Sequence, residues 1–160
     1  MKLKTRDLAV AGVIAAMYAV VTPMLAPISY GPVQFRVSEA LTLLPVLTPA
    51  AVPGLFIGCL VANVFGSYGL PDIAFGALST LVAAMLTRSL RKRVFLAPLP
   101  PVAVNALIIG ALLSVVENTP YWINALTVGI GQIGACYALG LPLLWALKKL
   151  PPSLTDAWFR

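Results

Sequence analysis

The chain has 160 residues, of which 60% are hydrophobic and only 10% are charged, and its formal net charge is +6. An ordinary soluble domain is about 45–50% apolar and about 25% charged, so this composition excludes a soluble domain and favours a protein folded in a bilayer. The length fits a single domain, residues 1–160. The basic residues lie between apolar runs, which indicates membrane topology and not a nucleic-acid partner.

The apolar runs predict an all-α membrane protein, a bundle of six transmembrane helices. Lipid offers no partner to backbone polar groups, which favours helices, and the alternating strands of a barrel are not seen in the sequence. The first run has a basic flank like that of a signal peptide, but it is long and no cleavage site follows, so we expect it to be retained as a span. The predicted spans are 8–26, 37–50, 52–67, 72–87, 101–116 and 123–147.

The basic residues predict the orientation of these spans. Cytoplasmic segments of membrane proteins carry an excess of Lys and Arg. With both termini in the cytoplasm, only Arg36 of the 11 basic residues falls outside, whereas five or seven spans would put one basic cluster on the wrong side. The basic residues predicted inside are Lys2, Lys4, Arg6, Arg88, Arg91, Lys92, Arg93, Lys148, Lys149 and Arg160.

Small residues recur every four positions in two of the runs, and such ridges let helix backbones approach closely. In the third span we favour packing within the bundle. In the first span the ridge is equally consistent with such packing and with docking of a partner protein in the bilayer. The ridge residues are Gly54, Gly58, Ala62 and Gly66 in the third span and Ala11, Ala15 and Ala19 in the first.

Prolines interrupt the helical pattern at three places, because proline lacks the amide donor and clashes with the preceding turn. The stretch 23–32 predicts an extracytoplasmic loop that dips toward the bundle. Three prolines between 45 and 53 predict a short, kinked second span, and three between 98 and 101 fix the start of the fifth. We find no inverted repeat between the two halves, so the design of many secondary transporters is not indicated.

Chemistry based on histidine or clustered cysteine is excluded. The chain has no histidine, and Cys59 and Cys136 stand alone inside apolar runs. This leaves no zinc-ligand spacing, no Cys-x-x-Cys pair and no histidine-based triad. With only five acidic residues, we predict no enzyme, no catalytic residue, no cofactor and no metal.

The few polar side chains within or beside the spans are the candidate ligand site. A charge at mid-bilayer costs about 2.5–3.5 kcal/mol on insertion scales, so such groups usually face a cavity or pair with another group. Most of them belong to the predicted outer side, where they indicate a pocket for a flat, hydrogen-bonding ligand. The tyrosines and Trp122 of that side belong either to this pocket or to the interfacial aromatic belt. The candidate ligand-binding residues are Gln34, Arg36, Glu39, Asn63, Asp72, Asn105, Trp122 and Gln132.

Arg36 and Glu39 are open to two interpretations. They are three residues apart, so they would be neighbours on a helix and could form an interfacial ion pair, with Glu39 in the first turn. Alternatively they contact a ligand, because Gln34 and Thr42 extend the same polar stripe into the membrane. Asp72 is likewise either a charge at a helix N-terminus or a pocket residue.

Several segments carry a resemblance to a known family. They are QFRVSEALTLLPVLTP at 34–49, GLFIGCLVANVFGSYGLPDIAFGALSTLVAAMLT at 54–87, then VNALIIGALL and the later GLPLL, and they resemble the QueT family. That family is similar in organisation to the substrate-binding membrane components of energy-coupling factor (ECF) transporters and is assigned to uptake of a queuosine precursor. Such proteins are expected to have an acidic residue near position 132, where this chain has Gln132.

The resemblance implies a mechanism with partner subunits. A queuosine precursor, 7-aminomethyl-7-deazaguanine, would be captured outside the cell membrane in a pocket that includes Gln34, Arg36, Glu39 and Asn63. The small residues of 11–19 would dock a transmembrane coupling subunit, which works with two ATPase subunits. A self-sufficient secondary carrier or channel, or an ECF component for another vitamin, remains an alternative. No Gly-x-x-x-x-Gly-Lys-Ser/Thr motif is present, so any ATP must be hydrolysed by another subunit.

Overall fold

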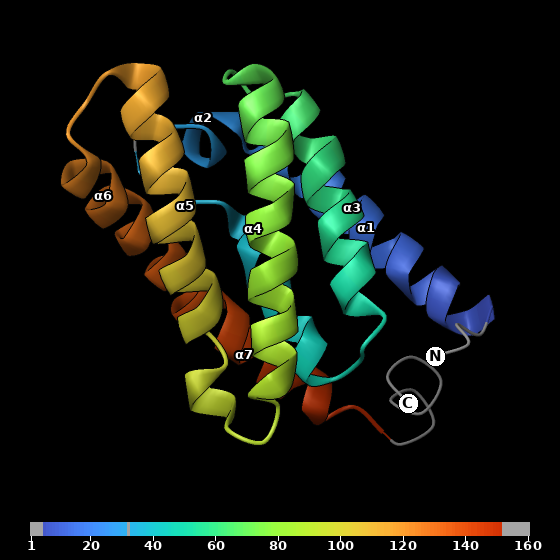
Figure 1. Ribbon diagram of the computed structural model, residues 1–160. Helices are drawn as coiled ribbons and strands as arrows, with labels where there is room; N and C mark the ends of the chain where they lie inside the picture. Colours follow the sequence, from blue (N-terminus) through green and yellow to red (C-terminus); the bar gives the residue numbers. More distant parts are fainter. Residues whose placement is uncertain (1–4, 32, 152–160) are drawn as a thin grey trace.

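The computed structural model describes residues 5–31 and 33–151, and its secondary structure within these ranges is helical (Figure 1). Lys2, Lys4 and Arg160, which the charge pattern placed in the cytoplasm, lie outside the described residues. The helices are α1 (Thr5–Met24), α2 (Ala26–Ser29), η1 (Val37–Val46), α3 (Ala51–Val64), α4 (Gly69–Ser89), η2 (Val94–Leu96), α5 (Leu99–Glu117), α6 (Tyr121–Ile133), η3 (Gly134–Gly140) and α7 (Leu141–Lys148).

Every predicted span coincides with a helical segment. Among the described residues, four segments are long and apolar enough to cross a membrane, and η1 and α3 are apolar but shorter, with 10 and 14 residues. The number of membrane crossings and the orientation stay predictions. The four long segments are Thr5–Met24, Gly69–Ser89, Val94–Glu117 and Tyr121–Lys148.

The two ridges of small residues pack against each other, which joins α1 to α3. A Cβ added at Gly54 would lie 2.7 Å from the carbonyl oxygen of Ala11, and one added at Gly58 would lie 2.9 Å from that of Ala15. Only glycine lets the two backbones come this close. The packing role predicted for the third-span ridge is therefore confirmed at these two positions.

The same contact favours packing within the bundle, one of the two alternatives for the first-span ridge, and a docking role for this ridge stays a prediction. Ala11 and Ala15 face α3, and Ala19 is half-buried, so this ridge is not a free surface. The side of α1 that stays open carries Gly12 and Ala16, and a Cβ added at Gly12 would meet nothing within 4 Å. The sequence showed that one face of α1 carries small residues, but not which neighbouring helix would cover that face.

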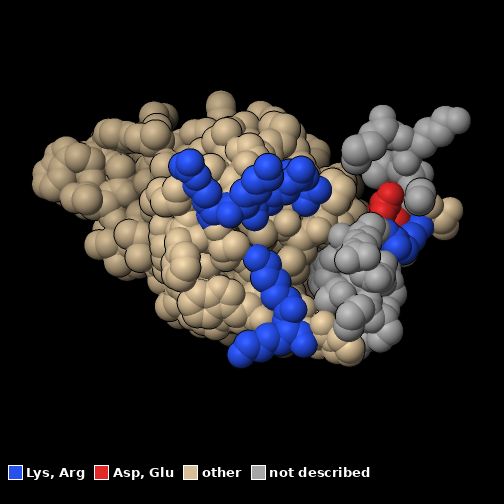
Figure 2. Space-filling model, turned by 90° about the horizontal axis from the view of Figure 1, so that it is seen from below, with Lys and Arg blue, Asp and Glu red and all other residues tan. Residues whose placement is uncertain are grey.

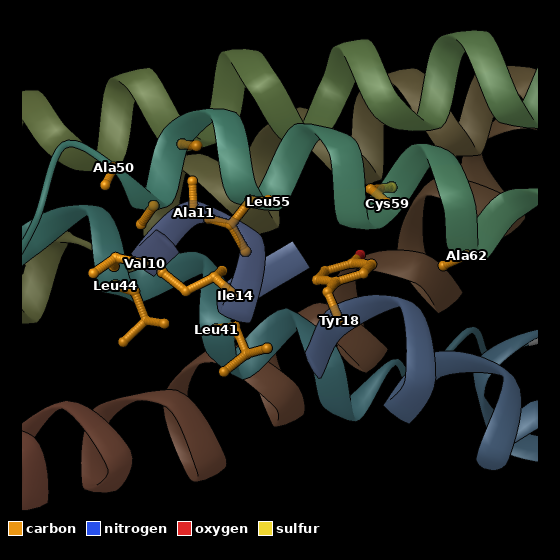
Figure 3. Close-up of a cluster of buried hydrophobic side chains, with 12 residues drawn as sticks. Val10, Ala11, Ile14, Tyr18, Leu41, Leu44, Ala50, Leu55, Cys59 and Ala62 are labelled. Carbon is orange, nitrogen blue, oxygen red and sulfur yellow. The ribbon is translucent and has the colours of Figure 1, made fainter. Parts of the chain in front are cut away.

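An apolar cluster surrounds the contact between α1 and α3 (Figure 3). Tyr18 of α1 and Leu55 of α3 are fully buried in it. Lipid is as apolar as these side chains, so close packing, and not removal from water, stabilises the cluster. The labelled members in Figure 3 are Val10, Ala11, Ile14, Tyr18, Leu41, Leu44, Ala50, Leu55, Cys59 and Ala62.

The second span is short, as the prolines predicted, but it is a 3₁₀ helix. Runs of this helix longer than three or four residues are uncommon, and η1 has ten, with every residue from Ser38 to Val46 buried. Its neighbours are α1, α3, α4, η3 and α7. The tight helix therefore runs through the middle of the bundle, and its first turn carries Glu39 into the interior.

Two other predicted segments differ from the structure. The last span, predicted as one helix over 123–147, contains the π-helical segment η3, which packs against η1. A Cβ added at Gly140 would lie 3.2 Å from the Ala40 carbonyl oxygen, so the widened turn falls where the two elements are closest. The stretch 23–32 is not wholly a loop, because α1 continues through Pro23 and Pro27 lies in the one-turn helix α2, just after its first residue. Proline is tolerated there since the first turn of a helix needs no amide donor.

Apart from the buried Arg36, the described basic side chains gather at one end of the bundle, the lower end of Figure 1, which faces the viewer in Figure 2. Helix α4 ends there with Arg88 in its last turn, and α7 ends with Lys148. Arg88 also donates to the carbonyl oxygen of Pro45 at 2.9 Å, which ties α4 to η1. This one-sided charge is the pattern that the topology prediction requires.

Candidate ligand-binding site

Glu39 lies at the centre of a buried polar cluster built from four helices. It is 1% exposed. The Tyr18 hydroxyl of α1 donates to Glu39 Oε1, and Asn105 Nδ2 of α5 donates to Oε2 at 3.4 Å. Ser79 of α4 donates in turn to Asn105 Oδ1 at 2.9 Å. The carboxylate of η1 is thus held by side chains from α1 and α5, and indirectly by α4.

Arg36 organises a second buried group next to the first. Its Nη1 donates to Asn63 Oδ1 at 3.0 Å and its Nε to the Ser29 carbonyl oxygen at 3.4 Å. Its Nη2 lies 3.6 Å from Asp72 Oδ2, and its guanidinium lies 5.5 Å from the centre of the Tyr30 ring. Asn63 also donates to the Asp72 carbonyl oxygen at 2.8 Å. The loop before η1, α3 and the start of α4 are therefore joined through one guanidinium.

The interpretation of Arg36 and Glu39 as an interfacial ion pair is wrong. Both side chains are buried, and the ion pair that Arg36 forms is with Asp72. Asp72 does lie in the first turn of α4, as predicted, but it is fully buried and not an exposed helix-terminal charge.

A cavity of about 10 Å³ joins the two groups. This is room for about one water molecule, so a heterocyclic ligand can enter only if neighbouring segments move apart. Gln34 reaches the cavity from a left-handed backbone conformation, with φ of 47°. The cavity is lined by Gln34, Arg36, Glu39, Gly76, Ser79, Thr80, Asn105, Ile109, Val128 and Gln132.

The structure brings most of the predicted site residues together. Asn63 and Asp72 contact Arg36 at the edge of the cavity. Trp122 is 64% exposed and does not line the cavity, so its position fits the interfacial belt that was the alternative for it. The predicted residues that do line the cavity are Gln34, Arg36, Glu39, Asn105 and Gln132.

Sequence reasoning missed Tyr18, Ser79 and Thr80. Tyr18 stands in an apolar span, where it reads as a core or interfacial aromatic residue. Ser79 and Thr80 follow Gly76 at three and four positions, so the three share one face of α4, and this spacing was the available signal. Cys136, which was set aside as a lone cysteine, lies 3.6 Å from the Glu39 carbonyl oxygen.

The charges of the two groups do not balance. Arg36 is compensated by Asp72, whereas Glu39 has neutral partners, Tyr18 and Asn105. A buried carboxylate needs donors and a countercharge to stay ionised, and here the donors are supplied by the protein. The arrangement can therefore receive a ligand that brings a positive charge to Glu39.

Comparison with known proteins identifies the family. The family model for the QueT transporter matches residues 8–149. The chain belongs to the QueT transporter family. The chain is 42% identical over 83 residues to the queuosine precursor transporter QueT of Lactococcus lactis subsp. cremoris (strain MG1363). The aligned segment covers 51% of this chain and 48% of that protein. The match thus spans about half the length of the curated relative, and no solved structure matches the chain.

Membership in the QueT family, together with the apolar helices, makes this a multi-pass protein of the cell membrane that belongs to a class of transporters. A transporter family is not an enzyme class. The polar cluster around Glu39 and Arg36 is accordingly the candidate site for the transported molecule.

Proposed function

We propose that the chain is the membrane-embedded substrate-binding component of an ECF-type ABC importer and captures a queuosine precursor, 7-aminomethyl-7-deazaguanine, from outside the cell. The observation that carries this proposal is Glu39, a buried carboxylate with neutral partners beside a cavity, in a chain of the QueT family. The aminomethyl group of the ligand is cationic at neutral pH and would supply the positive countercharge that the Glu39 carboxylate lacks.

The other cavity residues match a heterocycle of this kind. Gln34 and Gln132 each present a side-chain amide with donors and an acceptor, which suits the edge of a deazaguanine ring, while the amide of Asn105 is bonded to Glu39 and Ser79 and holds the carboxylate in place. Ile109 and Val128 supply apolar surface for its faces. Gln34 and Arg36 come from the loop after the first spanning helix, so this loop would help to hold the ligand.

Uptake of the ligand would be driven by ATP through a coupling subunit and two ATPase subunits. We propose that the coupling subunit covers the open side of α1, with Gly12 and Ala16, in place of the ridge that α3 occupies. An apolar groove of about 170 Å³ continues this surface, between α1, η1 and α7. The groove is lined by Val10, Val13, Ile14, Met17, Leu41, Leu44, Leu143 and Leu147.

The proposed topology has six spans with both termini in the cytoplasm. It is supported by the basic end of the bundle, which would face the cytoplasm, and by the site, which would then open toward the outside. The short helices η1 and α3 would cross as a pair within the bundle, where their length need not match the bilayer.

A thermal-shift screen of the detergent-purified chain tests the substrate. A ligand that binds only the folded state raises the melting temperature. Among deazapurines and common vitamins, 7-aminomethyl-7-deazaguanine should give the largest shift. A shift with a vitamin and none with any deazapurine would show that the substrate is another molecule.

Purification from cells that express an ECF coupling subunit and its ATPase pair tests the partners. The chain should co-purify with them, and uptake should stop when the ATPase active sites are inactivated. Uptake of the ligand by the chain alone, reconstituted in liposomes, would instead identify a self-sufficient carrier.

A further inference from the structure

Five buried side-chain atoms find no hydrogen-bond partner among the described residues, and four of them belong to Arg36, Asp72 and Ser29, which contact one another. They are Ser29 Oγ, Gln34 Nε2, Arg36 Nη2 and both carboxylate oxygens of Asp72. None of the four residues is more than 4% exposed. Gln34 and Arg36 line the cavity, whereas Asp72 and Ser29 lie against Arg36 just outside its lining. Buried polar groups in folded proteins are nearly always hydrogen-bonded, so these unpartnered atoms point to a ligand that reaches past the present lining to Asp72.

Asp72 and Arg36 are held so that their free atoms lie next to each other. The Asp72 backbone is fixed by Asn63, which donates to its carbonyl oxygen at 2.8 Å, and Asn63 also accepts from Arg36 Nη1. Arg36 Nη2 lies 3.6 Å from Asp72 Oδ2, which is an ion pair but too long for a hydrogen bond. The pair therefore offers one donor and two acceptors side by side.

This sequence of donor, acceptor and acceptor is complementary to one type of heterocycle edge. A guanine-like ring presents a carbonyl oxygen, a ring N–H and an exocyclic amino group in that order, so it accepts once and donates twice. An adenine-like ring presents an amino group beside an unprotonated nitrogen, which would leave one carboxylate oxygen facing a lone pair. Only the first arrangement satisfies Arg36 Nη2 and both oxygens of Asp72.

We propose that Asp72 and Arg36 form a specificity subsite that recognises the 6-oxo and 2-amino edge of a guanine-like ligand, while Glu39 receives its cationic arm. This assignment rests on the proposed function. It gives the two buried carboxylates separate roles: Asp72 selects the ring, and Glu39 selects the substituent.

The spacing along α4 fits a ligand held at both ends. Asp72 and Ser79 lie on the same face of the helix and about 10 Å apart along its axis, from a rise of about 1.5 Å per residue. Ser79 donates to Asn105, which donates to Glu39. Asp72 and Ser79, which is connected to Glu39 through Asn105, are therefore separated along α4 by a distance comparable with the long axis of a bicyclic ring that carries a one-carbon amine arm.

Calorimetry on the unmodified chain tests the subsite without any mutation. The ligands are 7-aminomethyl-7-deazaguanine, its analogue without the 2-amino group, and its analogue with a 2-oxo group. Each change leaves an Asp72 oxygen unpaired or against an acceptor, so affinity should fall at least about tenfold to a hundredfold. Equal affinity for the three would overturn the subsite and leave the proposed function standing. Failure of all three to bind would overturn both.

The substitution Asp72→Asn provides the converse test. Asn offers one acceptor and one donor, which match the ring N–H and the 2-oxo group, so the preference should reverse toward the 2-oxo analogue by about tenfold or more. Glu39→Gln is the matched control, in which the preference for the 2-amino ligand should persist while affinity for the aminomethyl arm falls. An Asp72→Asn chain that is folded and still prefers the 2-amino ligand would contradict the proposal. Should this variant fail to fold, the three-ligand comparison on the unmodified chain decides.

Discussion

Glu39 depends on a hydroxyl group from a helix whose sequence is otherwise almost wholly apolar. Tyr18 is fully buried, and its hydroxyl donates to Glu39. A second tyrosine makes the same kind of bond in a different setting, since Tyr68 donates to Glu117, which is exposed. The two pairs differ in burial, and this difference sets what each hydroxyl contributes to stability.

We expect Tyr18→Phe to destabilise the fold much more than Tyr68→Phe. Loss of the buried donor leaves Glu39 under-satisfied and should cost about 1–3 kcal/mol, whereas water replaces the donor at Glu117 and the cost should stay below about 0.5 kcal/mol. Thermal unfolding in detergent measures both. Similar melting temperatures for the two variants would contradict the described contact between Tyr18 and Glu39.

Arg36→Gln should be more damaging than Glu39→Gln to stability. Removal of the guanidinium leaves Asp72 as an uncompensated buried charge, a loss of about 3–5 kcal/mol for one partner of a buried pair. Glu39→Gln removes a charge whose partners are neutral, so the variant should stay folded. If the Arg36→Gln chain melted at the wild-type temperature, the pair with Asp72 would not be a structural contact.

Which polar residues gather in the buried cluster could largely be predicted from the sequence, but their pairing could not. A charged or amide side chain in an apolar run is informative by itself, and this singled out Glu39, Arg36 and Asn105. Arg36 and Glu39 are close in sequence but do not pair with each other. Each bonds to side chains of other helices, because other helices surround η1. Trp122 was assigned to the pocket from its position beside polar residues, and only the path of α6 shows that it points outward.

At the scale of the helices, the contact between α1 and α3 is the feature that follows most directly from the sequence. A small residue at every fourth position predicts close packing, and the two ridges do pack on each other. The 3₁₀ form of η1 and the π turn of η3 could not be predicted. The two elements pack against each other, and the sequence of neither contains a signal for its unusual helix type.

Gly58→Ala tests this contact, and Gly12→Ala, on the open side of α1, is its matched control. A Cβ at Gly58 would lie 2.8 Å from Tyr18 Cβ and 3.0 Å from Ala15 Cα, whereas one at Gly12 meets nothing within 4 Å. Overpacking costs typically about 1–3 kcal/mol, so Gly58→Ala should lower the melting temperature and Gly12→Ala should not. Equal stability of the two variants would show that α1 and α3 are farther apart than described.

Ala15→Leu should reduce stability, ligand binding and transport together. Ala15 packs against Gly58 in the turn before Tyr18, so a bulky side chain would push α1 away from α3 and shift the hydroxyl that holds Glu39. A variant that binds ligand normally but fails to transport it would restore the docking role that the sequence suggested for this ridge. Ligand affinity and uptake measured on the same variant separate these results.

At the scale of the whole molecule, the basic end of the bundle is the basis of the proposed orientation. Cysteines placed at Arg91 and Lys149 should be inaccessible to a membrane-impermeant label applied to whole cells, while one placed at Ser67, an exposed residue at the other end, should react. The native cysteines, Cys59 and Cys136, are buried and should not react with the label. Labelling of position 91 or 149 from outside would contradict the six-span topology.

Calorimetry on the purified wild-type chain and Glu39→Gln tests whether the chain binds a cationic deazaguanine through Glu39. The wild-type chain should bind 7-aminomethyl-7-deazaguanine at one site. The Glu39→Gln chain, still folded by its melting temperature, should lose about 1.5–3 kcal/mol of binding free energy, about tenfold to a hundredfold in affinity. No binding by the wild-type chain, or unchanged affinity in a folded Glu39→Gln chain, would contradict binding through Glu39.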